Sequence, residues 1–169
     1  TNLKNYTSLR KKKTLMIKIN VITTNIRWRR YIKKPNNFID KKISFYNKKN
    51  KTFKKKIIFC TLLLSDNQEI MKLNKKFRKI NKTTDVLSFP FYKKKELMRR
   101  FKKEKEVYLG DIIVNLSKIK DKKNILNFEI EFNKLWVHGL VHLLGHDHQK
   151  EKDYKKMNVI EKKFLRYLN

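Results

Sequence analysis

The sequence contains a single cysteine, Cys60, which excludes any internal disulfide bond. A chain without disulfides suits a reducing compartment, and Cys60 lies in the apolar run IIFCTLLL, so we expect a buried structural thiol. Long apolar runs are also missing, because the longest are about half of what a membrane-spanning helix needs. The basic stretch TNLKNYTSLRKKKTLMIK lacks the apolar core of a signal peptide. We therefore expect a cytoplasmic protein with no membrane partner.

Acidic residues are scarce: 15 Asp and Glu stand against 45 Lys and Arg, which gives a formal net charge of +30. A field of that sign attracts polyanions, and nucleic acid is the leading candidate. Lys, Asn and Ile are all plentiful, however, as they are when the base composition of a genome favours their codons. The charge alone does not decide between these two explanations.

The length of 169 residues suits one domain with an ordinary core. Hydrophobic residues make up 40% of the chain, which is close to globular usage. We expect a basic flexible leader over residues 1–14 and a single domain over residues 15–169.

Hydrophobic periodicity predicts strands and helices that alternate along most of the chain. Strands are expected at residues 15–21, 57–64, 85–91 and 107–116. Helices are expected after Pro35, over residues 66–77 with Ser65 and Gln68 as a capping box, from about 129 to 144, and over residues 150–168. No element is assigned to the basic stretch 92–106. We predict an α+β fold in which a small mixed sheet packs with helices, with the helix that ends near 144 as the central, metal-binding one.

All four histidines lie in HGLVHLLGHDH, residues 138–148. His138 and His142 are four residues apart, so on a helix their rings project from one face, at the spacing that two imidazoles need to share a metal ion. Gly145 follows where a left-handed glycine can end the helix. Either His146 or His148 can then return as third ligand. We favour His148, because a residue just past the break tends to point away, whereas three residues allow the return.

The order H-x-x-x-H-x-x-G-x-x-H repeats the ligand skeleton of the metzincin zinc proteases. Three neutral imidazoles with an open fourth position are typical of a catalytic zinc site, although imidazole also suits nickel and copper. Zincin proteases carry a glutamate base after the first histidine, whereas this chain has Gly139 there and no carboxylate over residues 139–146. A metal site is predicted and a protease is disfavoured. Asp147 could accept a hydrogen bond from a ligand ring, cap a helix, or act as the base that takes a proton from water.

The segment HGLVHLLGHDH resembles the signature H-G-x-L-H-L-x-G-x-D-H of the YbeY family of metal-dependent endoribonucleases. Two further blocks are similar to family motifs in the same order: LNKKFRKINKTTDVLSFPF at 73–91 and LGDIIV at 109–114. Together the blocks are specific and span residues 73–148. Val141 and His146 depart from the signature, where Leu and an aromatic residue are usual, and His146 offers a competing imidazole.

The resemblance implies a zinc-dependent, single-strand-specific endoribonuclease that matures the 3′ end of small-subunit ribosomal RNA and acts in ribosome quality control. By the resemblance, His138, His142 and His148 hold one Zn²⁺ ion, and Arg78 is the family's functional arginine. Arg78, His138 and His142 are thus the expected catalytic residues. The implied partners are RNA, in particular ribosomal RNA, and the small ribosomal subunit, without a small-molecule cofactor.

The residues themselves leave alternatives open. Arg78 either binds phosphate through two hydrogen bonds of its planar guanidinium group or is one solvated positive charge among many. Thr84, Asp85 and Ser88 either position substrate or hold a turn and a strand, while Trp136 is expected in the core. The alternative function is a non-catalytic ribosome- or RNA-binding protein with a structural metal site.

Overall fold

The computed structural model describes residues 15–49, 56–148 and 150–168. The expected basic leader at residues 1–14 lies outside them. The division into a leader and one domain therefore stays a prediction.

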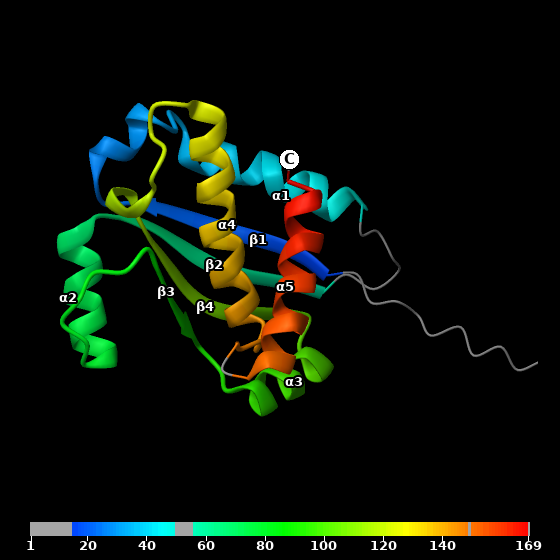
Figure 1. Cartoon of the computed structure of the whole chain (residues 1–169). Helices are drawn as coiled ribbons and strands as arrows, with labels where there is room; N and C mark the ends of the chain where they lie inside the picture. Colours follow the sequence, from blue (N-terminus) through cyan, green and yellow to red (C-terminus); the bar gives the residue numbers. More distant parts are fainter. Residues whose placement is uncertain (1–14, 50–55, 149, 169) are drawn as a thin grey trace, which may run out of the picture.

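A four-stranded sheet with the strand order β1-β2-β4-β3 forms the centre of the described part (Figure 1). The strands are β1 (Leu15–Thr23), β2 (Lys56–Ser65), β3 (Val86–Pro90) and β4 (Glu106–Asn115). β1, β2 and β4 run parallel, and β3 pairs antiparallel with β4. The prediction of a small mixed sheet is confirmed.

Helices lie on both faces of this sheet (Figure 1). The α-helices are α1 (Pro35–Lys49), α2 (Asn67–Arg78), α3 (Lys94–Lys103), α4 (Ile125–Leu143) and α5 (Glu151–Arg166), with short 3-10 helices η1 (Ile26–Arg30) and η2 (Leu116–Lys118). α1, α4 and α5 bury their apolar residues against one face. α2 packs Ile70 against Leu87 and Ile113 on the other face. The α+β class is confirmed.

The start of α2 differs from the expected capping box. Asp66, rather than Ser65, is the N-cap, and its carboxylate accepts from the N–H groups of Gln68 and Glu69. Ser65 is still part of β2, where it pairs with Asn115 and its hydroxyl donates to the carbonyl of Val114 at 3.2 Å. The cap moves by one residue because the strand ends one residue later than expected.

The basic stretch that follows β3 contains a helix that the sequence pattern did not predict, α3. Its Leu97 is buried, and Phe101 packs against the core four residues later. Arg100 pairs with Glu96 and Glu104, each four residues away. Two apolar residues among so many charges are too weak a periodic signal to indicate a helix.

α4 is the central helix, as expected. Phe128, Phe132 and Trp136 are fully buried along it. It begins at Ile125, earlier than the predicted start near Glu129, because Asn124 caps the N–H groups of Leu126 and Asn127. The first-turn residues Ile125 and Leu126 are exposed. They do not follow the helical period of the buried residues, so the sequence pattern did not include them in the helix.

α4 packs directly on the sheet at Gly139. A Cβ atom there would lie 2.5 Å from Cγ2 of Ile112 and 3.1 Å from Oγ of Ser88. Ile112 is β-branched and sits in a central strand, so its methyl group has little freedom to move. Gly139 therefore allows α4 to approach β3 and β4 closely, and this contact fixes the position of His138 and His142.

The outer edge of β1 is covered by two asparagine side chains of α1. Asn47 accepts from the N–H of Ile17 at 3.0 Å and donates to its carbonyl at 2.9 Å. Asn36 accepts from the N–H of Val21 at 3.1 Å. These amides take the hydrogen bonds that a further strand would otherwise take.

Cys60 is buried in β2 with 1% of its surface exposed. Burial, together with the negative charge of Asp111, raises the pKa of its thiol to about 12. The expected buried thiol is confirmed. None of the helices in the described residues combines the length and apolar character needed to cross a membrane.

Candidate metal centre

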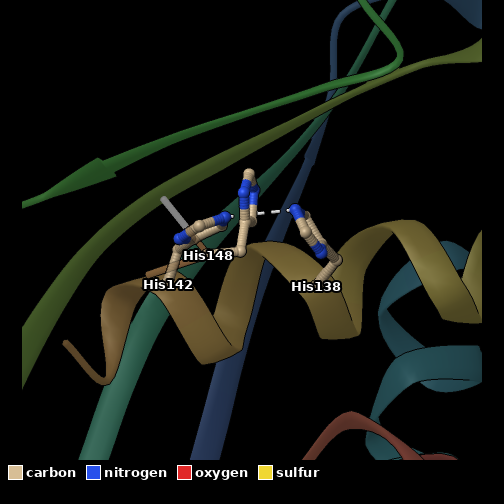
Figure 2. Close-up of side chains that lie close together, drawn as sticks. All are labelled: His138, His142 and His148. Carbon is tan, nitrogen blue, oxygen red and sulfur yellow. Dashed lines mark hydrogen bonds between the residues drawn. The ribbon is translucent and has the colours of Figure 1, made fainter. Parts of the chain in front are cut away.

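Three histidine rings converge at the C-terminal end of α4 (Figure 2). His138 and His142 project from one side of the helix, and His148 returns from the loop beyond it. One ring nitrogen of each lies within 4.8 Å of the other two. The structure thus brings together the three side chains that the sequence pattern singled out.

The return of the chain depends on Gly145. Its φ of +85° is left-handed, and its N–H donates to the carbonyl of His142 at 2.9 Å. The next N–H, of His146, donates to the carbonyl of Val141 at 3.3 Å. This pair of bonds is the Schellman motif that ends helices at glycine. The expected role of Gly145 is confirmed.

His146 contributes its backbone rather than its ring. Its carbonyl oxygen accepts a hydrogen bond from Nδ1 of His142 at 2.9 Å. Since a carbonyl can only accept, Nδ1 of His142 carries the proton and Nε2 of the neutral ring is left with a lone pair. Among the described residues, the ring of His146 is not part of the converging group, so it does not compete as a ligand.

His138 is held by a residue that the sequence pattern did not single out, Glu161 of α5. Oε1 of Glu161 lies 2.8 Å from Nδ1 of His138. The carboxylate accepts the Nδ1 proton, so Nε2 of His138 also carries a lone pair when the ring is neutral. A signal was available: Glu161 falls on the apolar stripe of α5, four residues after Met157 and three before Phe164, where an acid needs a partner.

The two Nε2 atoms lie 3.1 Å apart (Figure 2, dashed line). Two lone pairs that face each other at this distance repel unless a proton or a cation lies between them. Two imidazole ligands of a tetrahedral zinc ion, at 2.0–2.1 Å from it, would be about 3.4 Å apart. The donor set therefore fits a metal ion.

Burial, helped by the neighbouring His138, lowers the pKa of His142 from its ordinary value near 6.5. The ring is consequently neutral at pH 7. Neutral imidazole is the form that binds a metal ion, so no proton has to be displaced from His142 at that pH.

The histidines open into a cleft of about 990 Å³ between α4 and β3. Arg78, the last residue of α2, lines the same cleft, as do Thr84, Asp85 and Ser88. Arg78 and the histidines, which are 60 or more residues apart in the sequence, thus border one space. Trp136 is fully buried, as expected.

The turn before β3 is held by its own polar side chains. Oδ1 of Asp85 accepts from the N–H of Val86 at 2.8 Å and from the hydroxyl of Thr84 at 3.0 Å. The side chain of Asn115 donates to the carbonyl of Thr84 at 2.9 Å. Thr84 and Asp85 therefore hold the turn while they line the cleft.

Asp147 holds the loop that carries the third histidine. Its Oδ1 accepts from the backbone N–H of His148 at 2.8 Å. This bond lies within the loop and is not the helix cap considered for Asp147, because Lys150 is the N-cap of α5. The hydrogen bonds to the rings of His138 and His142 come from Glu161 and His146 instead.

Taken together, the fold and the site define an α+β protein with a three-histidine group, suited to one metal ion, at an open cleft. The family model described as Endoribonuclease YbeY matches residues 20–169. The chain belongs to the YbeY family of endoribonucleases.

Individual relatives agree with this assignment. An Endoribonuclease YbeY from Pelagibacter ubique is 47% identical over 144 residues, which cover 84% of this chain and 90% of the relative. One from Ehrlichia canis is 34% identical over 152 residues, 89% of this chain and 91% of the relative. The solution structure of TM1509 from Thermotoga maritima has a similar fold, with a TM-score of 0.52, 22% identity and 89% coverage of each chain.

Proposed function

We propose that the protein is a zinc-dependent endoribonuclease that hydrolyses phosphodiester bonds of single-stranded RNA. Its proposed substrate is small-subunit ribosomal RNA in the cytoplasm, in 3′-end maturation and ribosome quality control. The observation that carries the proposal is the convergence of three histidine nitrogens in an open cleft that Arg78 also lines. The name of the relatives, Endoribonuclease YbeY, supports the reaction class.

His138, His142 and His148 would hold the one ion. A zinc ion bound there would supply a Lewis acid and would lower the pKa of water to about 7. The protein's part is to keep the rings in place: Glu161 and the carbonyl of His146 hold each Nδ1–H, so both Nε2 atoms stay turned toward the ion.

Arg78 would bind the phosphate that is attacked. Its planar guanidinium can donate two parallel hydrogen bonds to phosphate oxygens, and this positive charge stabilises the extra negative charge that develops during displacement. Asp85 and Asp147 are the carboxylates that line the cleft. They are therefore the candidates for a proton acceptor on the protein.

Two competing functions are less well supported. A structural zinc site is closed by four protein ligands, whereas three groups converge in the described residues, beside a cleft. A metalloprotease would need its glutamate at position 139, but a side chain there would point into Ile112. The packing of α4 on the sheet excludes that geometry.

The test combines metal analysis of the purified protein with cleavage of single-stranded RNA before chelation, after chelation and after zinc is added back. We expect His142→Ala to lose metal and cleavage together. Arg78→Ala should keep its metal and cleave about 100-fold more slowly, because it loses one group that stabilises the transition state.

Arg29→Ala is the matched control, because Arg29 is an exposed arginine of η1 that does not line the cleft. It should cleave at the wild-type rate. Full cleavage by metal-free protein would contradict the proposal. Tight RNA binding by the wild-type protein without strand scission would favour the structural-metal alternative instead.

A further inference from the structure

Phe91 is an exposed aromatic side chain at the mouth of the cleft. It directly follows β3 and lines the same space as the histidines and Arg78. The residue is 64% exposed, a larger fraction than for any other phenylalanine, tyrosine or tryptophan in the described part. What distinguishes this exposed ring from the others is its position, because it lines the cleft that the histidines and Arg78 also line.

The ring is exposed but held in place. The backbone N–H of Phe91 donates to the carbonyl of Leu109 at 2.9 Å. Two tyrosines support the ring edge to face: Tyr92 with centroids 4.9 Å apart and Tyr108 with centroids 5.5 Å apart. A ring fixed in this way loses little conformational entropy when a flat partner stacks on it.

Positive charge flanks the ring. Lys93 and Lys94 follow Phe91 and line the cleft. Lys94 lies against the turn of the histidine loop, because its Cγ would be 3.3 Å from a Cβ atom at Gly145. Three cationic side chains thus line the cleft: Arg78, Lys93 and Lys94. Asp85 and Asp147 line it as well. An exposed aromatic face next to cations suits a ligand that combines a flat ring with phosphates, which describes a nucleotide.

We propose that Phe91 is a stacking subsite for an unpaired base of the RNA strand, with Lys93 and Lys94 on the phosphates that flank this base. The inference rests on the proposed ribonuclease function and adds the feature that selects the substrate. Inside a duplex both faces of a base are already stacked, so only an unpaired base can lie on the protein ring. Phe91 thus gives a physical reason for a preference for single strands.

The binding test uses the full chain with its metal, in an Arg78→Ala background in which cleavage of the RNA is about 100-fold slower. The affinity for a short labelled single-stranded RNA is measured by fluorescence anisotropy. Phe91→Ala should weaken binding about 5- to 150-fold, the range for loss of one stacked base. Phe91→Leu should bind the RNA as weakly as Phe91→Ala, because leucine is apolar but cannot stack. Phe91→Trp should bind it at least as tightly as the protein that keeps Phe91. Phe45→Ala, an exposed phenylalanine of α1, should bind normally.

A second readout reports the stacking itself. Trp28 and Trp136, the only tryptophans of the chain, are fully buried. An added tryptophan in Phe91→Trp is therefore exposed, and single-stranded RNA should quench its fluorescence. The same RNA should leave the fluorescence of Phe45→Trp unchanged. A duplex of the same sequence should bind Phe91→Ala and the unsubstituted protein equally.

The subsite is ruled out if Phe91→Ala binds the single strand as tightly as phenylalanine does, or if leucine restores full affinity. Equal loss of affinity for single strand and duplex would also overturn it. Normal RNA affinity combined with lost binding to the small ribosomal subunit would assign the ring to a protein contact instead. If Phe91→Ala binds and cleaves normally, the subsite fails and the nuclease stands. If the wild-type protein neither binds nor cleaves RNA, the proposed function fails.

Discussion

At the scale of single residues, the hydrogen bonds at Nδ1 of His138 and His142 determine that Nε2 of each ring is available to bind a metal ion. Glu161 and the carbonyl of His146 each hold an Nδ1 proton. Both Nε2 atoms are thereby prepared for a metal before it arrives. Partners of this kind usually matter almost as much as the ligands.

Glu161→Gln should therefore weaken zinc binding about 10-fold, and Glu161→Ala by up to about 100-fold, because His138 loses the charge that orients it and makes it more basic. Competition with a chromogenic chelator measures this directly. Glu151→Gln is the matched control, since Glu151 lies on the same helix but pairs with Lys155 in solvent. Wild-type zinc affinity in both Glu161 variants would show that Glu161 does not orient the ligand.

The sequence allowed the three ligand candidates and Arg78 to be named, because their evidence is local: spacing on one helix, a glycine, and a resemblance in motif. Glu161 escaped notice because its contact with His138 joins two helices across 23 residues. The choice between His146 and His148 followed from the chain reversal at Gly145, which sequence reasoning anticipated. That His146 would contribute its carbonyl depends on the full geometry of the turn.

At the scale of elements, the site depends on how closely α4 lies on β3 and β4. Gly139→Ala places a methyl group against Ile112. The overpacking costs about 1–3 kcal/mol, and alanine returns about 1 kcal/mol of helix propensity. We expect the free energy of unfolding in urea to fall by up to about 2 kcal/mol.

A double-mutant cycle supplies the control. Ile112→Ala removes the methyl group that would clash, so the double variant Gly139→Ala with Ile112→Ala should lose less stability than the sum of the two single changes, by at least about 0.5 kcal/mol. Strict additivity, or a more stable Gly139→Ala protein, would mean that the helix is free to move away from the sheet.

The strands and most helices were predictable because each has a clear apolar period, as in the alternation of Ile17, Ile19 and Val21 in β1. α3 was not predictable, since Leu97 and Phe101 are embedded in lysine and arginine. The N-terminal end of α4 was misjudged because exposed Ile125 and Leu126 look like core residues in the sequence. Packing of Leu97 and Phe101 on the core decides the first case, whereas the local cap at Asn124 decides the second.

At the scale of the whole molecule, the net charge of +30 makes the affinity for RNA depend on the salt concentration. Contacts between lysine or arginine and phosphate release counterions, with a slope of about −0.7 per contact for single strands when the logarithm of affinity is plotted against that of salt. With roughly five contacts, affinity should fall about a hundredfold between about 50 and 200 mM salt.

Anisotropy titrations in the same Arg78→Ala background measure this slope, and an uncharged oligonucleotide analogue of the same sequence serves as the control. The analogue should bind weakly, with little dependence on salt. A flat salt profile for RNA itself would mean that the excess of lysine reflects codon usage rather than a binding surface.

The two edges of the sheet, β1 and β3, differ in how their backbone groups are covered. Asn36 and Asn47 occupy backbone groups of Ile17 and Val21 in β1, so fewer groups are left for another polypeptide to pair with on that side. On the opposite side, β3 pairs with β4 alone in the described part and forms a wall of the cleft. A strand added at the β3 edge would therefore lie beside the cleft. RNA bound in the cleft would compete with such strand addition, because both would use the same edge of the sheet.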